Sequence, residues 1–265
     1  RSLVDYRQQP DKYVIAVFGD SFTFGADAAD EDVWPTVLQG LDERFQVINL
    51  GVDAYGLDQM YLLLRESLDE YKPALAIFAP YSDDFNRSLL TCRDCPKPRF
   101  VLGKDGGLEL TGIPIPDPSD FFNALRVNYG YWNPRAPLNA ENAAFVKTIQ
   151  EGSYGKEWTA LNRRIVEEAI ACAREKGVDF LLTHLAGNIE IAANAKPSDR
   201  FDAEVLLEEV ARERLVPFVS TRLTFLETPG KWVDGHYQGP EARLVARVVR
   251  DALYTTAAWK RCAGN

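Results

Sequence analysis

The sequence has few histidines, cysteines and methionines, and each shortage narrows the chemistry that the chain can perform. Among 265 residues it holds two histidines, four cysteines and one methionine. Four cysteines are too few for the disulfide scaffold of a small secreted domain. Any mechanism that relies on an imidazole base must use His184 or His236.

Basic residues and long apolar runs are also in short supply. Lysine and arginine number 30 against 39 acidic residues, which gives a net charge of −9. We therefore expect no nucleic-acid partner, because neutralising phosphates takes clustered basic side chains. No apolar stretch approaches the ~18 residues that span a bilayer, so the sequence shows no membrane span.

The cellular location stays open at this stage. The sequence begins at Arg1 rather than at an initiator methionine, which leaves room for an export signal or a membrane anchor ahead of it. Cys92 and Cys95 form a lone Cys-x-x-Cys followed by Pro-Lys-Pro. A zinc site would need two further ligands, and a redox motif would open a helix after a strand. We predict a local disulfide between these two cysteines, which would favour an exported or periplasmic protein over a cytoplasmic one.

What the sequence does contain is a regular alternation of apolar runs and helical patterns. Such an alternation indicates a parallel sheet with helices on both faces. We predict one flavodoxin-like three-layer α/β/α domain over residues 1–265, with a five-stranded parallel sheet. The expected strands are 13–18, 45–50, 74–79, 180–183 and 216–219, and the main expected helices are 57–71, 156–176, 198–212 and 239–254.

The alternation stops between about residues 91 and 155. This stretch is rich in proline and in aromatic side chains. Long loops in compact domains are usually functional lids or disordered segments, and the aromatic content argues against disorder. We therefore predict a packed, lid-like insertion near the functional site.

The first predicted strand runs directly into Gly19-Asp20-Ser21-Phe22-Thr23-Phe24-Gly25. This turn delivers the Ser21 hydroxyl to the carboxyl end of the sheet, where open α/β sheets bind their ligands. The alternative is a strand-to-helix turn in which Ser21 only caps a helix.

A serine nucleophile needs a base, and the base needs an orienting group. In Asp234-Gly235-His236 the first and third side chains point to the same side of an extended loop, so Asp234 can reach one ring nitrogen of His236. The other nitrogen is then free to face a serine. His184 also ends a predicted strand, but no carboxylate stands beside it in the sequence, so a structural role or a substrate contact fits it better.

Together, Gly19-Asp20-Ser21, Gly51 in Asn49-Leu50-Gly51, and Asp234-Gly235-His236 resemble the SGNH (GDSL) hydrolase superfamily over about residues 13–253. The resemblance implies Ser21 as nucleophile, His236 as base and Asp234 as its orienting carboxylate. It also implies an oxyanion held by the N–H groups of Ser21 and Gly51 and by one side-chain donor. No cofactor and no metal are expected.

The sequence departs from the family pattern at this side-chain donor. The family's third block, Gly-x-Asn-Asp, overlays on Tyr81-Ser82-Asp83-Asp84 and places Asp83 where the asparagine belongs. An ionised carboxylate cannot donate a hydrogen bond. Either burial keeps Asp83 protonated, or Asn86 serves instead.

The resemblance predicts a serine esterase that acts on an acyl ester such as an O-acetyl group, borne by a small molecule or a glycan. Two other functions stay open. The same residues would support an O-acyltransferase, and a catalytically silent glycan-binding domain could keep the fold without the activity. The acyl chain, the alcohol and the oligomeric state are not encoded in any motif of the sequence.

Overall fold

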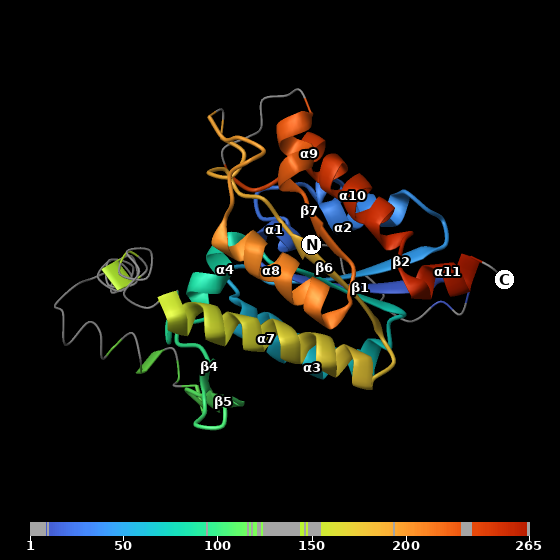
Figure 1. Cartoon of the computed structure of the whole chain (residues 1–265). Helices are drawn as coiled ribbons and strands as arrows, with labels where there is room; N and C mark the ends of the chain where they lie inside the picture. Colours follow the sequence, from blue (N-terminus) through green and yellow to red (C-terminus); the bar gives the residue numbers. More distant parts are fainter. Residues whose placement is uncertain are drawn as a thin grey trace.

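The computed structural model describes residues 9, 11–93, 95–115, 117, 119–120, 123, 144–145, 147, 155–192, 194–228 and 235–263. These residues form a parallel β-sheet with helices on both faces, as Figure 1 shows. Asp234 and most of the second half of the predicted insertion lie outside the described residues. Within this part of the chain, no helix is both long and apolar enough to cross a membrane.

The order of the strands confirms the predicted fold class. The sheet consists of five parallel strands in the order β2-β1-β3-β6-β7. They are β1 (Tyr13–Gly19), β2 (Phe45–Gly51), β3 (Leu75–Ala79), β6 (Asp179–His184) and β7 (Phe218–Ser220). This is the flavodoxin-like order, in which the chain reverses direction across the sheet between β1 and β3. A ligand is expected outside the carboxyl ends of these two strands.

Both faces of the sheet are covered, which explains why its strands are continuously apolar. Ala16 and Phe18 of β1 pack with α3 (Leu57–Tyr71), α7 (Gly155–Glu175) and α8 (Asp202–Arg214). Ile15 and Val17 point to the other face, which is covered by α2 (Trp34–Gly40), α10 (Gly239–Leu253) and α11 (Ala257–Ala263). Each such side chain stabilises the fold by ~1.5–3 kcal/mol when fully buried.

Most predicted elements are confirmed, with shifts of a few residues at their ends. The helix predicted over 57–71 is α3, and those predicted over 156–176 and 239–254 are α7 and α10. Gly177 has a φ of +69° directly after α7, as expected of a helix-ending glycine. The sequence analysis did not predict α9 (Arg222–Glu227), α11 or the two strands β4 (Arg99–Leu102) and β5 (Leu108–Thr111).

The main described element of the predicted insertion is an antiparallel hairpin of β4 and β5. Phe100 of β4 is buried against Tyr61 of α3, with ring centroids 5.6 Å apart. At the base of the hairpin the buried Lys97 ammonium is ion-paired with the buried Asp58 carboxylate. The hairpin is therefore fixed to the domain, whereas the lid-like role of the insertion stays a prediction.

Cys92 and Cys95 lie in the turn that leads into this hairpin. Cys92 forms an isolated antiparallel bridge with Pro96, and its side chain is buried while that of Cys95 is exposed. No disulfide joins the two thiols in the structure. The predicted disulfide therefore remains to be tested by alkylation of the protein in solution.

Candidate active site

The predicted nucleophile lies at the carboxyl end of β1, in the turn that begins α1 (Ser21–Phe24). Asp20 caps this short helix, because its Oδ1 accepts a hydrogen bond from the Phe22 N–H at 2.9 Å. A Cβ at Gly19 would lie 2.1 Å from Thr23 Oγ1, so this turn requires a glycine. The turn presents Ser21, which is 3% exposed, at the switch point of the sheet.

His236 is the imidazole that the structure brings to this serine. Its Nε2 lies 2.9 Å from Ser21 Oγ, although the two residues are 215 positions apart. The next residue, Tyr237, is buried and donates a hydrogen bond to the Ala186 carbonyl at 2.6 Å. The Phe22 ring packs edge-on against both the His236 and Tyr237 rings, at 5.0 and 4.9 Å. These contacts hold the imidazole in front of the hydroxyl.

The carboxylate on the other ring nitrogen is one that the sequence analysis missed. Asp27 Oδ2 lies 2.8 Å from His236 Nδ1. Asp27 belongs to the acidic loop after α1 and has a φ of +64°, a conformation that aspartate tolerates better than most residues. The hydrogen-bond network assigns the proton to Nδ1, so that Nε2 accepts from Ser21. Asp234, the carboxylate predicted from the sequence, lies outside the described residues.

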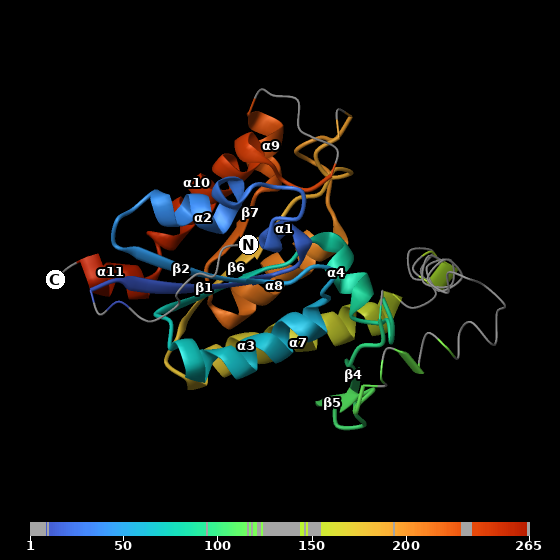
Figure 2. The same cartoon turned by 180° about the vertical axis from the view of Figure 1, so that it is seen from behind.

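A network of buried charged side chains contacts the turn that carries Ser21. Asp20 Oδ2 lies 3.1 Å from Ser21 Oγ, where it competes with His236 Nε2 for the one hydroxyl hydrogen, and it forms an ion pair with Arg87 Nη1, also at 3.1 Å. Arg87 is the last residue of α4 (Ser82–Arg87), and the same Nη1 is 2.9 Å from Asp84 Oδ1. Figures 1 and 2 both show α1 and α4 next to each other at this edge of the sheet.

The network buries two carboxyl groups, Asp20 and Asp84, against the one guanidinium of Arg87. Burial and the nearby Asp20 raise the pKa of Asp84 well above its ordinary value, although Arg87 acts in the opposite direction. Burial alone would lower the pKa of Arg87, but the charges of Asp84, Asp20 and Asp83 outweigh burial and raise this pKa. The guanidinium therefore stays charged. Arg87 therefore joins α4 to the nucleophile turn, and neither the sequence motif nor the spacing predicts this role.

Asp83 and Asn86, the two candidate side-chain donors, lie on one face of α4 and contact each other. Asn86 Nδ2 donates to Asp83 Oδ1 at 3.3 Å, and Arg87 Nε donates to Asp83 Oδ2 at 3.0 Å. Both Asp83 oxygens thus act as acceptors here. The Asn86 carbonyl accepts from Trp158 Nε1 at 3.0 Å. Asp83 takes one amide hydrogen of Asn86, and the other has no acceptor among the described residues.

Of the two predicted backbone donors, the Ser21 amide has no acceptor within the described part of the chain, whereas the Gly51 amide has one. Ser21 opens α1, and the first N–H groups of a helix have no acceptor within it. The Gly51 N–H instead donates to the Asn49 side chain at 2.9 Å. A Cβ at Gly51 would lie 2.4 Å from Phe24 N, so this glycine lets β2 approach α1 closely. Gly51 can serve an oxyanion only after its bond to Asn49 opens.

Comparisons with known proteins support the architecture. No family model matches the sequence, and no curated protein is significantly similar to it. Solved structures do match, among them a member of the lipolytic G-D-S-L family from Veillonella parvula, at a TM-score of 0.50 and 14% identity over 92% of this chain and 99% of that one. The chain has the SGNH hydrolase fold.

Two acetyl xylan esterases share this SGNH fold. One matches at a TM-score of 0.52 and 13% identity, over 91% of this chain and 99% of that one. The other is a catalytic mutant of an enzyme from Geobacillus stearothermophilus. It matches at a TM-score of 0.54 and 12% identity, over 93% of this chain and 96% of that one. At such identities the likeness establishes the fold, and function has to be argued from the site.

His184, the second histidine, belongs to a separate buried network in the SGNH fold. Its Nε2 lies 3.1 Å from Ser82 Oγ and 3.3 Å from Glu190 Oε1, and its Nδ1 lies 3.2 Å from Ser220 Oγ. Ser82 gives its hydrogen to Glu190, so only acceptors face Nε2; the ring proton is therefore assigned to Nε2, and Nδ1 accepts from Ser220. His184 does not contact Ser21 in this network, which fits the structural role expected for it.

Glu190 is the carboxylate of this second network. Burial alone would raise its pKa, but the hydrogen bonds from His184, the Gly187 amide and Ser82 outweigh burial and hold the pKa of Glu190 below its ordinary value. Glu190 is therefore ionised at neutral pH and accepts hydrogen bonds only. Nothing in the sequence marks Glu190, because it meets its partners only through the fold.

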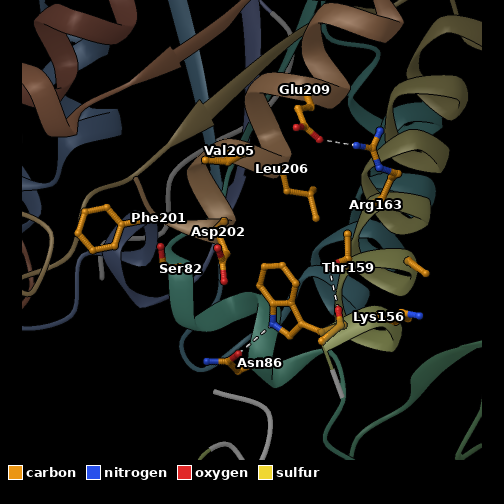
Figure 3. A pocket seen from close by; sticks show the side chains of 14 residues that line it. Ser82, Asn86, Lys156, Thr159, Arg163, Phe201, Asp202, Val205, Leu206 and Glu209 are labelled. Atoms are coloured by element: carbon orange, nitrogen blue, oxygen red, sulfur yellow. Dashed lines mark hydrogen bonds and ion pairs between the residues drawn. The ribbon is translucent and has the colours of Figure 1, made fainter. Parts of the chain in front are cut away.

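A cavity of about 910 Å³ lies between α4, α7 and α8, and neither Ser21 nor His236 lines it. Figure 3 shows Ser82 and Asn86 of α4 on one side of it, and Asp202, Val205 and Leu206 of α8 on another. The α7 wall includes Trp158 and Arg163. The cavity therefore begins at the helix that carries the candidate oxyanion donors.

Proposed function

We propose that the chain is a serine ester hydrolase in which Ser21 is the nucleophile and His236 the general base. The approach of His236 Nε2 to Ser21 Oγ, at 2.9 Å, is the observation that carries the proposal. The two residues lie at the switch point of an SGNH fold, which adds support because ligands bind at this point in open α/β sheets. Loss of the base or the nucleophile would remove the covalent step.

In the proposed reaction Ser21 Oγ attacks the ester carbonyl while its proton moves to His236 Nε2. A carboxylate on Nδ1 holds the ring and stabilises the imidazolium, a role for which Asp27 and Asp234 are the candidates. The alcohol leaves with the proton from His236, and an acyl-serine remains. Water, activated by the same imidazole, then releases the acid and restores the hydroxyl of Ser21.

The oxyanion would be held by the Ser21 and Gly51 amides and by a side chain of α4, either Asp83 or Asn86. Each such donor stabilises the transition state by about 2.7–4 kcal/mol. Asn86 already has an amide hydrogen to offer, whereas Asp83 would first have to take up a proton and release Arg87.

The substrate would be an acyl ester with a small acyl group, such as an O-acetyl group on a sugar. Two structures that share the SGNH fold are described as acetyl xylan esterases, which supports this choice. The cavity beside the site gives a large alcohol group a place to bind.

Turnover of p-nitrophenyl acetate, with and without an added sugar acceptor, tests the proposal. We expect hydrolysis by the wild-type chain, and no turnover above background by Ser21→Ala. Faster release of nitrophenol with the acceptor, together with an acetylated sugar, would instead identify an O-acyltransferase. A chain that binds sugars but turns over no ester would be a silent binding domain, and the proposal would be wrong.

A further inference from the structure

The indole of Trp158 is a rigid aromatic surface in the cavity wall. One of its faces stacks on the buried Phe85 ring, with centroids 5.4 Å apart and planes at 24°. Its Nε1–H donates to Asn86 Oδ1 at 3.0 Å, which fixes the ring within its plane. Since Trp158 lines the cavity, the opposite face of the indole is the one that a ligand can contact.

Polar side chains line the same cavity as this aromatic face. Figure 3 shows Ser82, Asn86 and Asp202 around the same open space. The Ser82 hydroxyl donates its hydrogen to Glu190 Oε1 at 2.7 Å. Toward a ligand hydroxyl, the Ser82 oxygen can therefore act only as an acceptor. Asn86 keeps one amide hydrogen to donate, and the Asp202 carboxylate accepts. The wall thus offers both acceptors and a donor beside one flat apolar surface.

We infer that this cavity binds a pyranose ring of the alcohol part of the substrate, an inference that rests on the proposed function. A pyranose has an apolar face of C–H groups and a rim of hydroxyls that both donate and accept. The first matches the Trp158 face, and the second matches Ser82, Asn86 and Asp202. Such a site sets substrate choice, and the amide hydrogen of Asn86 serves the sugar where Asp83 rather than Asn86 holds the oxyanion.

The position of the cavity fits the alcohol side of an ester that is bound at Ser21. Asn86 lines the cavity and is hydrogen-bonded to Asp83, which Arg87 links to Asp20 and so to the nucleophile turn. A long acyl chain is the competing occupant. The wall also carries the ion pair between Arg163 and Glu209, at 2.7 Å, and a purely apolar chain would gain nothing from such groups.

Relative kinetics test the inference. For wild type and Trp158→Ala we would measure kcat/KM for an acetylated xylo-oligosaccharide and for p-nitrophenyl acetate. We expect the ratio of the two to fall about tenfold or more in Trp158→Ala and about threefold or less in Trp158→Phe, which keeps an aromatic face. Asp202→Asn should lower the same ratio and serves as a second variant if Trp158→Ala folds poorly.

Arg200→Ala is the matched control, because Arg200 forms an exposed ion pair with Glu208 of α8 and does not line the cavity. Its ratio should equal that of the wild type. An unchanged ratio in both Trp158→Ala and Asp202→Asn would overturn the inference. A selective loss of p-nitrophenyl octanoate turnover in these variants would also overturn it, because it would assign the cavity to the acyl chain.

Calorimetry with unacetylated xylohexaose separates this inference from the proposed function. Ser21→Ala protein should bind the oligosaccharide, and adding Trp158→Ala should weaken binding about tenfold or more. Binding that depends on Trp158, in a wild-type chain that hydrolyses no ester, supports the sugar site and refutes only the esterase. Ester hydrolysis without any Trp158-dependent change refutes only the sugar site.

Discussion

The contact between Asp27 and His236 leads to a prediction that the sequence motif would not give. Asp27→Asn removes the negative charge beside Nδ1 but keeps an oxygen that can accept its hydrogen. The variant therefore isolates the electrostatic stabilisation of the imidazolium that forms when Ser21 gives up its proton. We expect a lower kcat, with little change in the amount of folded protein.

The size of the effect follows from the exposure of the pair. Opposite unit charges ~4 Å apart attract by about 1 kcal/mol in water and about 4 kcal/mol at an effective dielectric constant of 20. The side chains of His236 and Asp27 are 27% and 71% exposed, so solvent screening places the pair near the lower limit. A loss of about 1–2 kcal/mol corresponds to about a five- to thirtyfold decrease in kcat.

The assay is the hydrolysis of p-nitrophenyl acetate at low and high salt, with Asp234→Asn as the comparison. The advantage of wild type over Asp27→Asn should shrink as salt rises, because the pair is exposed. The reasoning is refuted if Asp27→Asn keeps the wild-type kcat while Asp234→Asn loses about four orders of magnitude, the effect of removing a buried triad carboxylate. That result would return the role to Asp234, as the sequence predicts.

Three further predictions concern Asp83, the buried pair Asp58–Lys97, and the two cysteines. Asp83→Asn should keep or raise the esterase kcat, since an amide can donate to the oxyanion, and a hundredfold loss would contradict this. Asp58→Asn should destabilise the fold by about 3–5 kcal/mol in urea unfolding, because it leaves the Lys97 charge buried, and Asp58→Leu combined with Lys97→Met should recover most of the loss. Burial raises the pKa of Asp58 to about 6 despite Lys97, so the folded state binds a proton at Asp58 more readily than the unfolded state does. The free energy of unfolding of wild type, relative to Asp58→Asn, should therefore rise as pH falls from about 6 to about 4. An opposite slope would refute the raised pKa of Asp58. Intact-mass measurement after alkylation without reductant should find Cys92 and Cys95 protected, and two alkylated thiols would disprove their disulfide.

The sheet could be predicted because burial on both faces leaves a direct mark on the sequence. Residues 13–18 are apolar throughout, as a strand covered on both sides must be. The helix α11 has no comparable apolar pattern in the sequence. Its Trp259 is buried against Tyr13 and Phe45, both at 5.4 Å, and this packing rather than local propensity fixes the helix.

Apart from the Ser21–His236 pair, which the family resemblance implied, the candidate site was predictable where chemistry depends on neighbours in sequence, and not where it depends on distant residues. The turn around Ser21 is local, and its glycines and aspartate are visible in the sequence. Asp27 lies 209 residues from His236, and Arg87 lies 67 residues from Asp20. Such pairs form only when the sheet brings the carboxyl ends of its strands together, so no motif reports them.

Covalent labelling with a fluorophosphonate tests the central claim most directly. The geometry of Ser21 and His236 predicts one equivalent of label per chain, on a peptide that contains Ser21. Labelling should be lost in Ser21→Ala and reduced to background in His236→Ala, while His184→Asn should still be labelled if it folds. Label that persists in Ser21→Ala, or a wild-type chain that takes up none, would contradict the assignment of Ser21 as an activated nucleophile.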